Sequence, residues 1–372
     1  MNRPARKILL LLLALLLIGV LLWAAHGRMR VPGFSWDRLG EALRGARLDL
    51  LLLSLFAIYV CYWIRGLRWV RLSRHIGPAG IWSVFEATLM GFVAIVLLGR
   101  AGEPVRPFLI GRRERLSISS MFGVFVVERL LDVSVTIFMT GWSLILLPRL
   151  LREHEAGNHS SPAWSRLALL QKAGFALFAG LLVAVVFLMY LHITHGGVFA
   201  RQMERWRATS GWRCSVAGIF IGFLEGLQAL QNWGDFAVAV VLTAAHWSLV
   251  LAIYVWVPRS FGGDFASFGL RAAVLTLACT MLGSALQLPV IGGGSWAGTF
   301  GALTLFLGVA REPAMAAAVT LWLITFASCS FAGIPLLLRE GMSLGELRRI
   351  ATQRDERTAG APAAAPSKGI QP

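Results

Sequence analysis

The chain is a succession of long apolar runs separated by short segments rich in arginine. Runs of about 18 or more apolar residues are long enough to cross a bilayer as helices. Nine segments follow or approach this pattern: Ile8–Ala25, Leu48–Ile64, Trp82–Leu98, Ser117–Leu147, Leu167–Ile193, Phe236–Val257, Leu270–Leu288, Phe300–Val309 and Ala314–Leu338. The pattern predicts an all-α polytopic membrane protein.

The basic residues between the runs predict the orientation of the chain. Short loops rich in arginine and lysine stay in the cytoplasm. Basic residues precede the first run and follow the last one, so we expect both termini to be cytoplasmic, which requires an even number of crossings. One of the nine segments must then turn back within the bilayer, and we assign this role to Trp82–Leu98 with residues 99–107. We therefore expect about eight transmembrane helices plus one or two re-entrant or broken helices.

The remaining segments have simpler interpretations. Ile8–Ala25 could be a cleaved signal peptide, but it is longer than a usual signal core, which favours an uncleaved first helix. Residues 26–47 and Ser215–Leu230 have the pattern of interfacial or half-buried helices. We expect residues 1–340 to form one integral membrane domain. Residues 341–372, which are charged and then rich in alanine and proline, should be a disordered cytoplasmic tail.

The composition narrows the class of protein further. Of the 372 residues, 57% are hydrophobic and 15% are charged, and the net charge is +16. In a soluble protein this charge would indicate nucleic acid, but here the basic residues lie between apolar runs and no basic soluble module exists, so we expect no nucleic-acid partner. The four cysteines form no CxxC pair, and His246 has no second histidine at metal spacing. We therefore expect no disulfide framework and no metal site.

The stretch from Leu97 to Asp132 departs most from a simple span. It contains GRAGEPVRP at residues 99–107, where glycine and proline should break the helix. Irregular backbone survives at bilayer depth only beside protein or a water-filled cavity that satisfies its polar groups. Arg100 and Arg106 could present donors to a phosphate, and Glu103 could orient Arg106. We interpret this stretch as the lining of a polar cavity.

Three further ionisable residues follow inside the next apolar run. Glu128 and Asp132 share one helix face at i,i+4, and Arg129 could neutralise one of them. One hypothesis is a buried network of these residues with Glu103 and Arg106, which exchanges partners when an anionic headgroup enters. The alternative is a static set of ion pairs that joins two helices, because buried networks often serve specificity.

A second broken segment, LPVIGGGSWAG at residues 288–298, lies in the other half of the chain. A pair of such segments in corresponding halves is typical of the central site of a transporter and makes an inverted repeat a hypothesis. Gly292, Gly293 and Gly294 allow close approach of the backbone, and a helix restarting at Ser295 would direct its N-terminal amides at an anion. The alternative is a tight glycine-rich turn between packed helices.

Signatures of an enzyme are missing from the sequence. It contains no GxSxG or HExxH motif and no DxD-like acidic cluster in a loop. No nucleotide-binding module is recognisable, so we expect no cofactor. Any active transport would need a gradient or another external source of energy.

The sequence GRAGEPVRPFL, followed by SISSMFGVFVVERLLD, resembles the signature of the lysylphosphatidylglycerol synthase transmembrane (flippase-like) family. RGLRW and LPVIGGG are also similar to its pattern, and the resemblance covers roughly residues 5–340. It implies a bacterial inner-membrane protein with about eight spans and re-entrant pieces. In bifunctional members this domain moves aminoacylated phosphatidylglycerol between leaflets, and a C-terminal soluble domain synthesises that lipid. This chain ends in a short tail, so we do not expect synthase activity.

Two features depart from the family pattern. Ser295 and Gly298 stand where the family often has glycine and then glutamate, and TLWLITFASC lacks an arginine common in the last helix. Gln287, Ser295 and Thr299 are the polar groups left in that half of the site. The second half could therefore recognise a different headgroup, or none.

These observations favour a lipid translocator that binds an anionic phospholipid or a polyprenyl-linked lipid. One alternative is a membrane-embedded lipid-modifying transferase with Glu128 or Asp132 as general base. Another is a non-transporting accessory subunit of envelope lipid synthesis. We expect membrane lipids as partners, and the sequence leaves a homodimer open.

Overall fold

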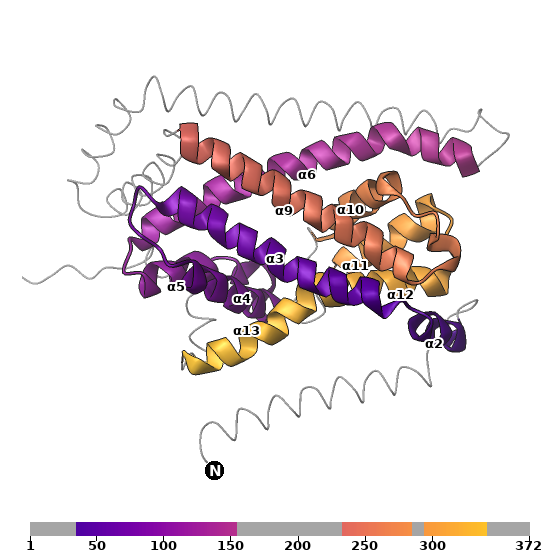
Figure 1. Ribbon diagram of the computed structural model, residues 1–372, viewed down its shortest axis with the longest axis horizontal. Helices are drawn as coiled ribbons and strands as arrows, with labels where there is room; N and C mark the ends of the chain where they lie inside the picture. Colours follow the sequence, from indigo (N-terminus) through magenta and orange to yellow (C-terminus); the bar gives the residue numbers. More distant parts are fainter. Residues whose placement is uncertain (1–34, 155–232, 285–293, 341–372) are drawn as a thin grey trace, which may run out of the picture.

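The computed structural model describes residues 35–154, 233–284 and 294–340, in which every regular element is a helix (Figure 1). The all-α class predicted from the apolar runs is confirmed. The predicted spans Ile8–Ala25 and Leu167–Ile193 lie outside the described residues, as do the predicted helix Ser215–Leu230 and the tail.

The first half of the chain forms five described helices: α2 (Trp36–Arg44), α3 (Leu48–Ser73), α4 (Ile81–Leu98), α5 (Val105–Arg113) and α6 (Ile118–His154). A 3₁₀ turn, Gly99–Gly102, joins α4 to α5. The helix α3 continues nine residues beyond the predicted end of its span at Ile64. This correction places Arg65, Arg68 and Arg71 inside a helix instead of in a loop.

The second half also contributes five described helices: α9 (Trp233–Ser260), α10 (Leu270–Ser284), α11 (Gly294–Gly301), α12 (Arg311–Trp322) and α13 (Ser328–Arg339). A π-helical turn, Leu323–Ala327, makes α12 and α13 one continuous rod. The predicted short span Phe300–Val309 is wrong, because α11 ends at Gly301 and a π-helical turn leads to Gly308, whose φ is +65°.

Four of the described helices are long and apolar enough to cross a membrane: Leu48–Ser73, Ile81–Leu98, Gly234–Ser260 and Arg311–Arg339. The protein is therefore a polytopic membrane protein. The total of about eight crossings stays a prediction, because part of the chain lies outside the described ranges.

The helices α3 and α9 form an antiparallel pair at the centre of the bundle (Figure 1). The amide of Arg47 donates to the carbonyl of Ser260 at one end of the pair, and Arg71 pairs with Asp235 at the other end. The ring Nδ1 of His246 donates to the carbonyl of Cys61 at mid-length, 3.1 Å away. His246 is thus a hydrogen-bonded packing residue, as predicted.

The segment predicted to turn back forms a helical hairpin. The chain leaves α4 at Gly99, whose φ of +63° suits glycine, and a Cβ on Gly102 would collide with the carbonyl of Ala94. The helix α5 then returns along α4, so that Arg113 at its end donates to the carbonyl of Ser83 and to Glu86 near the start of α4. Both ends of the hairpin therefore lie together, as a re-entrant segment requires.

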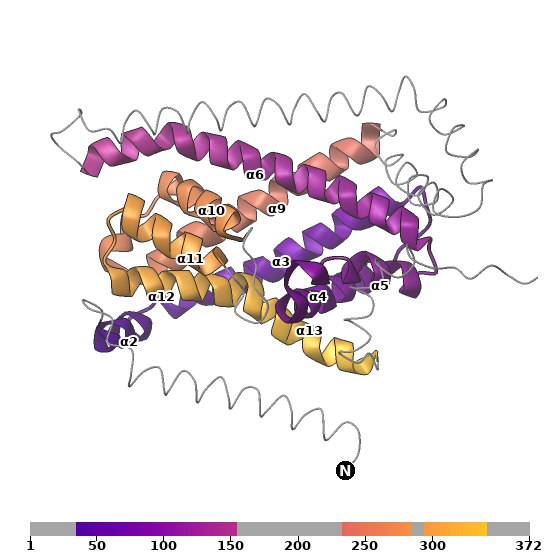
Figure 2. The ribbon, with the colours of Figure 1, turned by 180° about the vertical axis from the view of Figure 1, so that it is seen from behind.

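In the second half, α10 and α11 form another antiparallel helical hairpin, which starts at the opposite end of the α3–α9 pair. The helix α11 packs on α10 so closely that a Cβ on Gly283, Gly294 or Gly298 would strike backbone atoms of the facing helix. The hairpin α4–α5 packs on α13, whereas α10 packs on α6. The long helix α6 runs along one side of the bundle from the α5 end to the α10 end (Figure 2). Each hairpin thus packs on a helix of the other half, as expected if the chain holds an inverted repeat.

The helix α2 is the short amphipathic helix expected within residues 26–47. Ser35 caps it by accepting a hydrogen bond from the amide of Arg38, and none of its own residues is buried. The amide of Ser35 also donates to Glu312 at 3.0 Å, which holds α2 beside α12.

Candidate functional site

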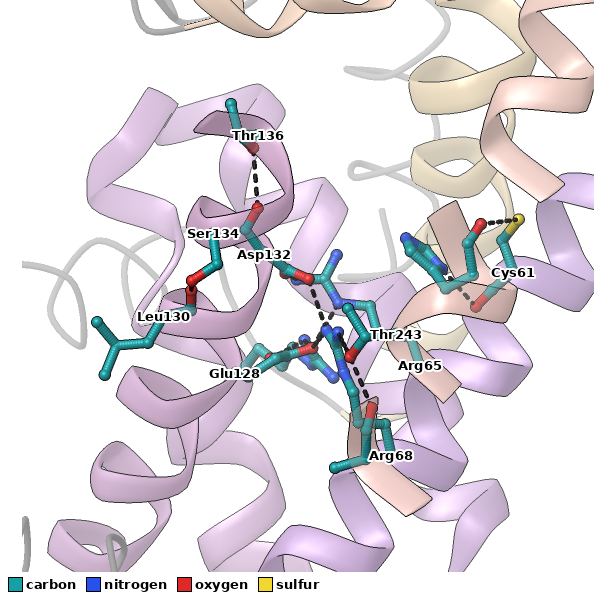
Figure 3. A network of polar contacts seen from close by, with 12 residues as sticks. Cys61, Arg65, Arg68, Glu128, Leu130, Asp132, Ser134, Thr136 and Thr243 are labelled. Carbon is teal, nitrogen blue, oxygen red and sulfur yellow. Dashed lines mark hydrogen bonds and ion pairs between the residues drawn. The ribbon is translucent and has the colours of Figure 1, made fainter. Parts of the chain in front are cut away.

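The site is built around two pairs of opposite charges that face each other across α3 and α6. Arg65 and Arg68 are three residues apart on α3, and Glu128 and Asp132 are four residues apart on α6. Residues at these spacings share one face of a helix. The basic pair therefore meets the acidic pair where the two helices pack together (Figure 3).

Glu128 is the centre of this network. Its side chain is 0% exposed and accepts hydrogen bonds from Arg65 Nε at 2.6 Å and from Arg68 Nη2 at 3.0 Å. Arg106 Nη1 of α5 lies 3.1 Å from Oε1 and 2.9 Å from Oε2 of the same carboxylate. A buried carboxylate is costly unless it is paired and hydrogen-bonded, and three arginines satisfy both conditions here.

Asp132 joins the network one helical turn further along α6. It accepts from Arg68 Nη2 at 2.9 Å and from Arg65 Nη2 at 3.3 Å. Arg68 also donates through Nη1 to the hydroxyl of Thr243 on α9, 2.8 Å away (Figure 3). The network thus joins four helices, α3, α5, α6 and α9.

Arg106 is fixed by its packing as well as by Glu128. Its guanidinium carbon lies 4.5 Å from the ring centre of Trp69, a cation–π distance. Gly91 of α4 allows the close approach of α5, because a Cβ there would lie 3.2 Å from the Cβ of Arg106. After these contacts, the Nε and Nη2 atoms of Arg106 are buried with no hydrogen-bond partner among the described residues.

A small cavity, partly open to the surroundings, lies beside the network. Its polar wall contains three arginines and one glutamate: Arg65, Arg106, Arg129 and Glu103. Thr88, Gly91, Phe92, Ile95 and Phe125 complete the wall. The cavity therefore combines an apolar lining with an excess of positive charge, a combination that suits an anion attached to an apolar body.

Arg129 has a different role from the one predicted. The arginines that pair with Glu128 and Asp132 are Arg65, Arg68 and Arg106, and Arg129 forms no ion pair within the described part of the chain. The guanidinium carbon of Arg129 lies 5.1 Å from the ring centre of Phe125, and its Nε is buried without a hydrogen-bond partner in the described ranges.

Glu103 and Arg100 lie at the tip of the first hairpin. Glu103 borders the cavity, but no hydrogen bond joins it to Arg106 among the residues that the structure describes, so the predicted orienting contact is absent. Arg100 lies in the 3₁₀ turn, and its side chain is outside the described part.

The second broken segment is described only in part. Gln287, Gly292 and Gly293 lie outside the described residues, and α11 begins at Gly294, next to the predicted start at Ser295. The carbonyl of Ser295 accepts from Thr299, whose hydroxyl lies 2.6 Å from that of Thr280. Neither Gly294 nor Ser295 lines the cavity described above.

Sequence reasoning missed Arg65 and Arg68 as members of the site. The arginines of RGLRW directly follow an apolar run, where a signal for cytoplasmic orientation and a phosphate-binding group have the same pattern. The available signal was the i,i+3 spacing of these arginines, which matches the i,i+4 spacing of Glu128 and Asp132. Within the described ranges, no group of three or more histidine, cysteine or acidic side chains could hold a metal ion.

Comparison with known proteins agrees with this architecture. The family model for the lysylphosphatidylglycerol synthase TM region matches residues 11–333. The chain belongs to this family. A UPF0104 membrane protein of Methanothermobacter thermautotrophicus (strain Delta H) is 30% identical over 140 residues, which cover 35% of this chain and 39% of that protein. The chain thus matches about two fifths of the length of this relative, and no solved structure matches the chain.

Proposed function

We propose that this member of the lysylphosphatidylglycerol synthase TM region family is a lipid translocator, which takes an anionic phospholipid or a polyprenyl-linked lipid by its headgroup. The observation that carries the proposal is the wall of three arginines at the cavity. Ionisable side chains at bilayer depth are costly, and they are most often retained for function. The headgroup would enter the cavity while its acyl or prenyl chains stay in the lipid.

The connection of the cavity to four helices suggests how binding could be coupled to movement. Glu128 occupies one donor edge of Arg106, and it also binds the arginines of α3. A phosphate that entered the cavity would share Arg106 with Glu128 and would weaken the contact between α5 and α6. The two hairpins, which start at opposite ends of the α3–α9 pair, would then be the elements that rearrange.

The same contacts weigh against the transferase alternative. A general base needs a free carboxylate within reach of the proton that it removes. Both oxygens of Glu128 and both oxygens of Asp132 already accept from arginine. The accessory-subunit alternative predicts that substitutions in the network leave lipid movement unaffected.

The bacterial inner membrane, cytoplasmic termini and lipid partners belong to this proposal. The full chain would be purified and reconstituted into vesicles that contain fluorescent phosphatidylglycerol, and the lipid that reaches the outer leaflet would be bleached by a membrane-impermeant reductant. Native mass spectrometry of the same preparation would test a homodimer and would detect lipids that copurify.

The variants Arg106→Ala and Arg129→Ala should each slow lipid movement by about tenfold or more, because a charge-assisted hydrogen bond contributes about 1.5–3 kcal/mol. Arg112→Ala is the matched control, since Arg112 is exposed on the same helix as Arg106. If a folded Arg106→Ala protein moved lipid at the rate of the unsubstituted chain, the proposed role of the cavity would be wrong.

A further inference from the structure

The free edge of Arg106 has the geometry of an oxyanion receptor. Its Nη1 is used by Glu128 and one face is covered by Trp69, so only Nε and Nη2 remain. These two N–H groups lie on the same edge of the planar guanidinium and point in parallel. This is the fork that binds two oxygens of a phosphate or carboxylate at once.

Arg129 supplies a third unfilled donor at the same cavity. Its Nε is buried without a partner in the described ranges, and Arg106 and Arg129 both line the cavity wall. A buried donor without an acceptor is costly. Three such N–H groups on two neighbouring arginines indicate that an acceptor with several oxygens belongs between them.

The number of charges around the cavity limits the charge of that acceptor. The described side chains that form the network or line the cavity include four arginines, Arg65, Arg68, Arg106 and Arg129. They include three acids, Glu103, Glu128 and Asp132. The balance is one positive charge, and a charge left unmatched in a buried site carries a large desolvation cost.

We infer that the group received by this cavity is a singly charged phosphodiester, held by the Nε–Nη2 edge of Arg106 and by Arg129, in preference to a phosphate group with two or more charges. This inference rests on the proposed function and specifies its substrate class. Glu103 forms no ion pair in the described residues. Its carboxylate sets the preference because it lowers the net positive charge around the cavity by one. It is thus a specificity-determining residue.

The test compares two lipids with the same acyl chains in detergent-solubilised full chain. Dioleoyl phosphatidylglycerol carries one charge on a phosphodiester, and dioleoylglycerol pyrophosphate carries at least two. The affinity of each would be measured by the shift in the melting temperature of the protein, with phosphatidylcholine as the uncharged reference. We expect phosphatidylglycerol to bind roughly tenfold more tightly than the pyrophosphate lipid, since an excess buried charge is penalised.

The variant Glu103→Gln tests the charge count directly. It keeps the shape of the side chain and raises the balance to two positive charges, so the preference should shift toward the pyrophosphate lipid. Glu41→Gln on the exposed face of α2 is the matched control and should change neither affinity.

Two outcomes would overturn the inference. One is a preference of the unsubstituted chain for the pyrophosphate lipid, as expected if a further cation such as Arg100 entered the cavity. The other is an unchanged preference in Glu103→Gln. In either case lipid movement that depends on Arg106 would still support the proposed function, so the two failures are distinguishable.

Discussion

Arg68 of α3 and Glu128 of α6 form an ion pair that is almost completely removed from solvent. The Nη2–Oε1 distance is 3.0 Å, and the two side chains are 1% and 0% exposed. They are 60 residues apart in the chain. Each of them also binds other members of the network. We therefore expect a change in the charge of the cavity to change the stability of the bundle.

Glu128→Gln should destabilise the protein strongly. The substitution leaves Arg65, Arg68 and Arg106 together with one acid fewer, and removal of one partner from a buried ion pair costs about 3–5 kcal/mol. The melting temperature of the purified protein and its resistance to denaturant would measure the loss. Glu114→Gln, at the C-terminal end of α5 and outside the network, should leave both quantities unchanged. Equal stability of the two variants would contradict the assignment of Glu128 as the centre of the network.

Trp69 should be needed to position Arg106. Trp69→Leu removes the ring that covers the guanidinium and with it a cation–π interaction of up to about 2 kcal/mol. We expect lipid movement to slow several-fold in Trp69→Leu and less in Trp69→Phe, which retains an aromatic face. Trp82→Leu is the matched control, because Trp82 is 65% exposed on α4. Equal rates in Trp69→Leu and Trp82→Leu would show that Arg106 does not depend on the ring.

Gly91→Leu should close the cavity without removing any charge. The new side chain would compete for space with the Cβ and Cγ atoms of Arg106, which lie 3.2 and 3.8 Å from the position of its Cβ. We expect the binding of phosphatidylglycerol to weaken in lipid-binding measurements. Gly141→Leu on α6 is the control, since nothing lies within 4 Å of its Cβ position. Unchanged binding in Gly91→Leu would place the lipid outside this cavity.

The hairpin α4–α5 should have both ends on one side of the membrane. After replacement of the native cysteines, single cysteines at Arg74 and Arg112 should be labelled by an impermeant thiol reagent only from the cytoplasmic side. A cysteine at Asp264, at the opposite end of the α3–α9 pair, should be labelled only from the outside. All three positions are exposed. Labelling of Arg74→Cys and Arg112→Cys from opposite sides would mean that α4 crosses the membrane and that the re-entrant assignment is wrong.

Several features could be predicted from the sequence because they depend on local chemistry. The apolar runs predict membrane helices, and Gly99, Gly102 and Pro104 predict the break before α5. Glu128 and Asp132 were predicted to share a face because the spacing of a helix is fixed. The end of α3 was predicted less well, since arginine is a good helix former and a helix does not have to end where its apolar run ends.

By itself, the sequence determined that the chain crosses a membrane, where its regular helices break and which ionisable residues lie inside apolar segments, because hydrophobicity and backbone preference are local properties. Only the tertiary structure decided that Arg65 and Arg68 pair with Glu128 and Asp132, and that Arg129 faces the cavity instead. An ion pair depends on the distance between side chains from separate helices. That distance follows from how α3, α5 and α6 pack, which no single segment encodes.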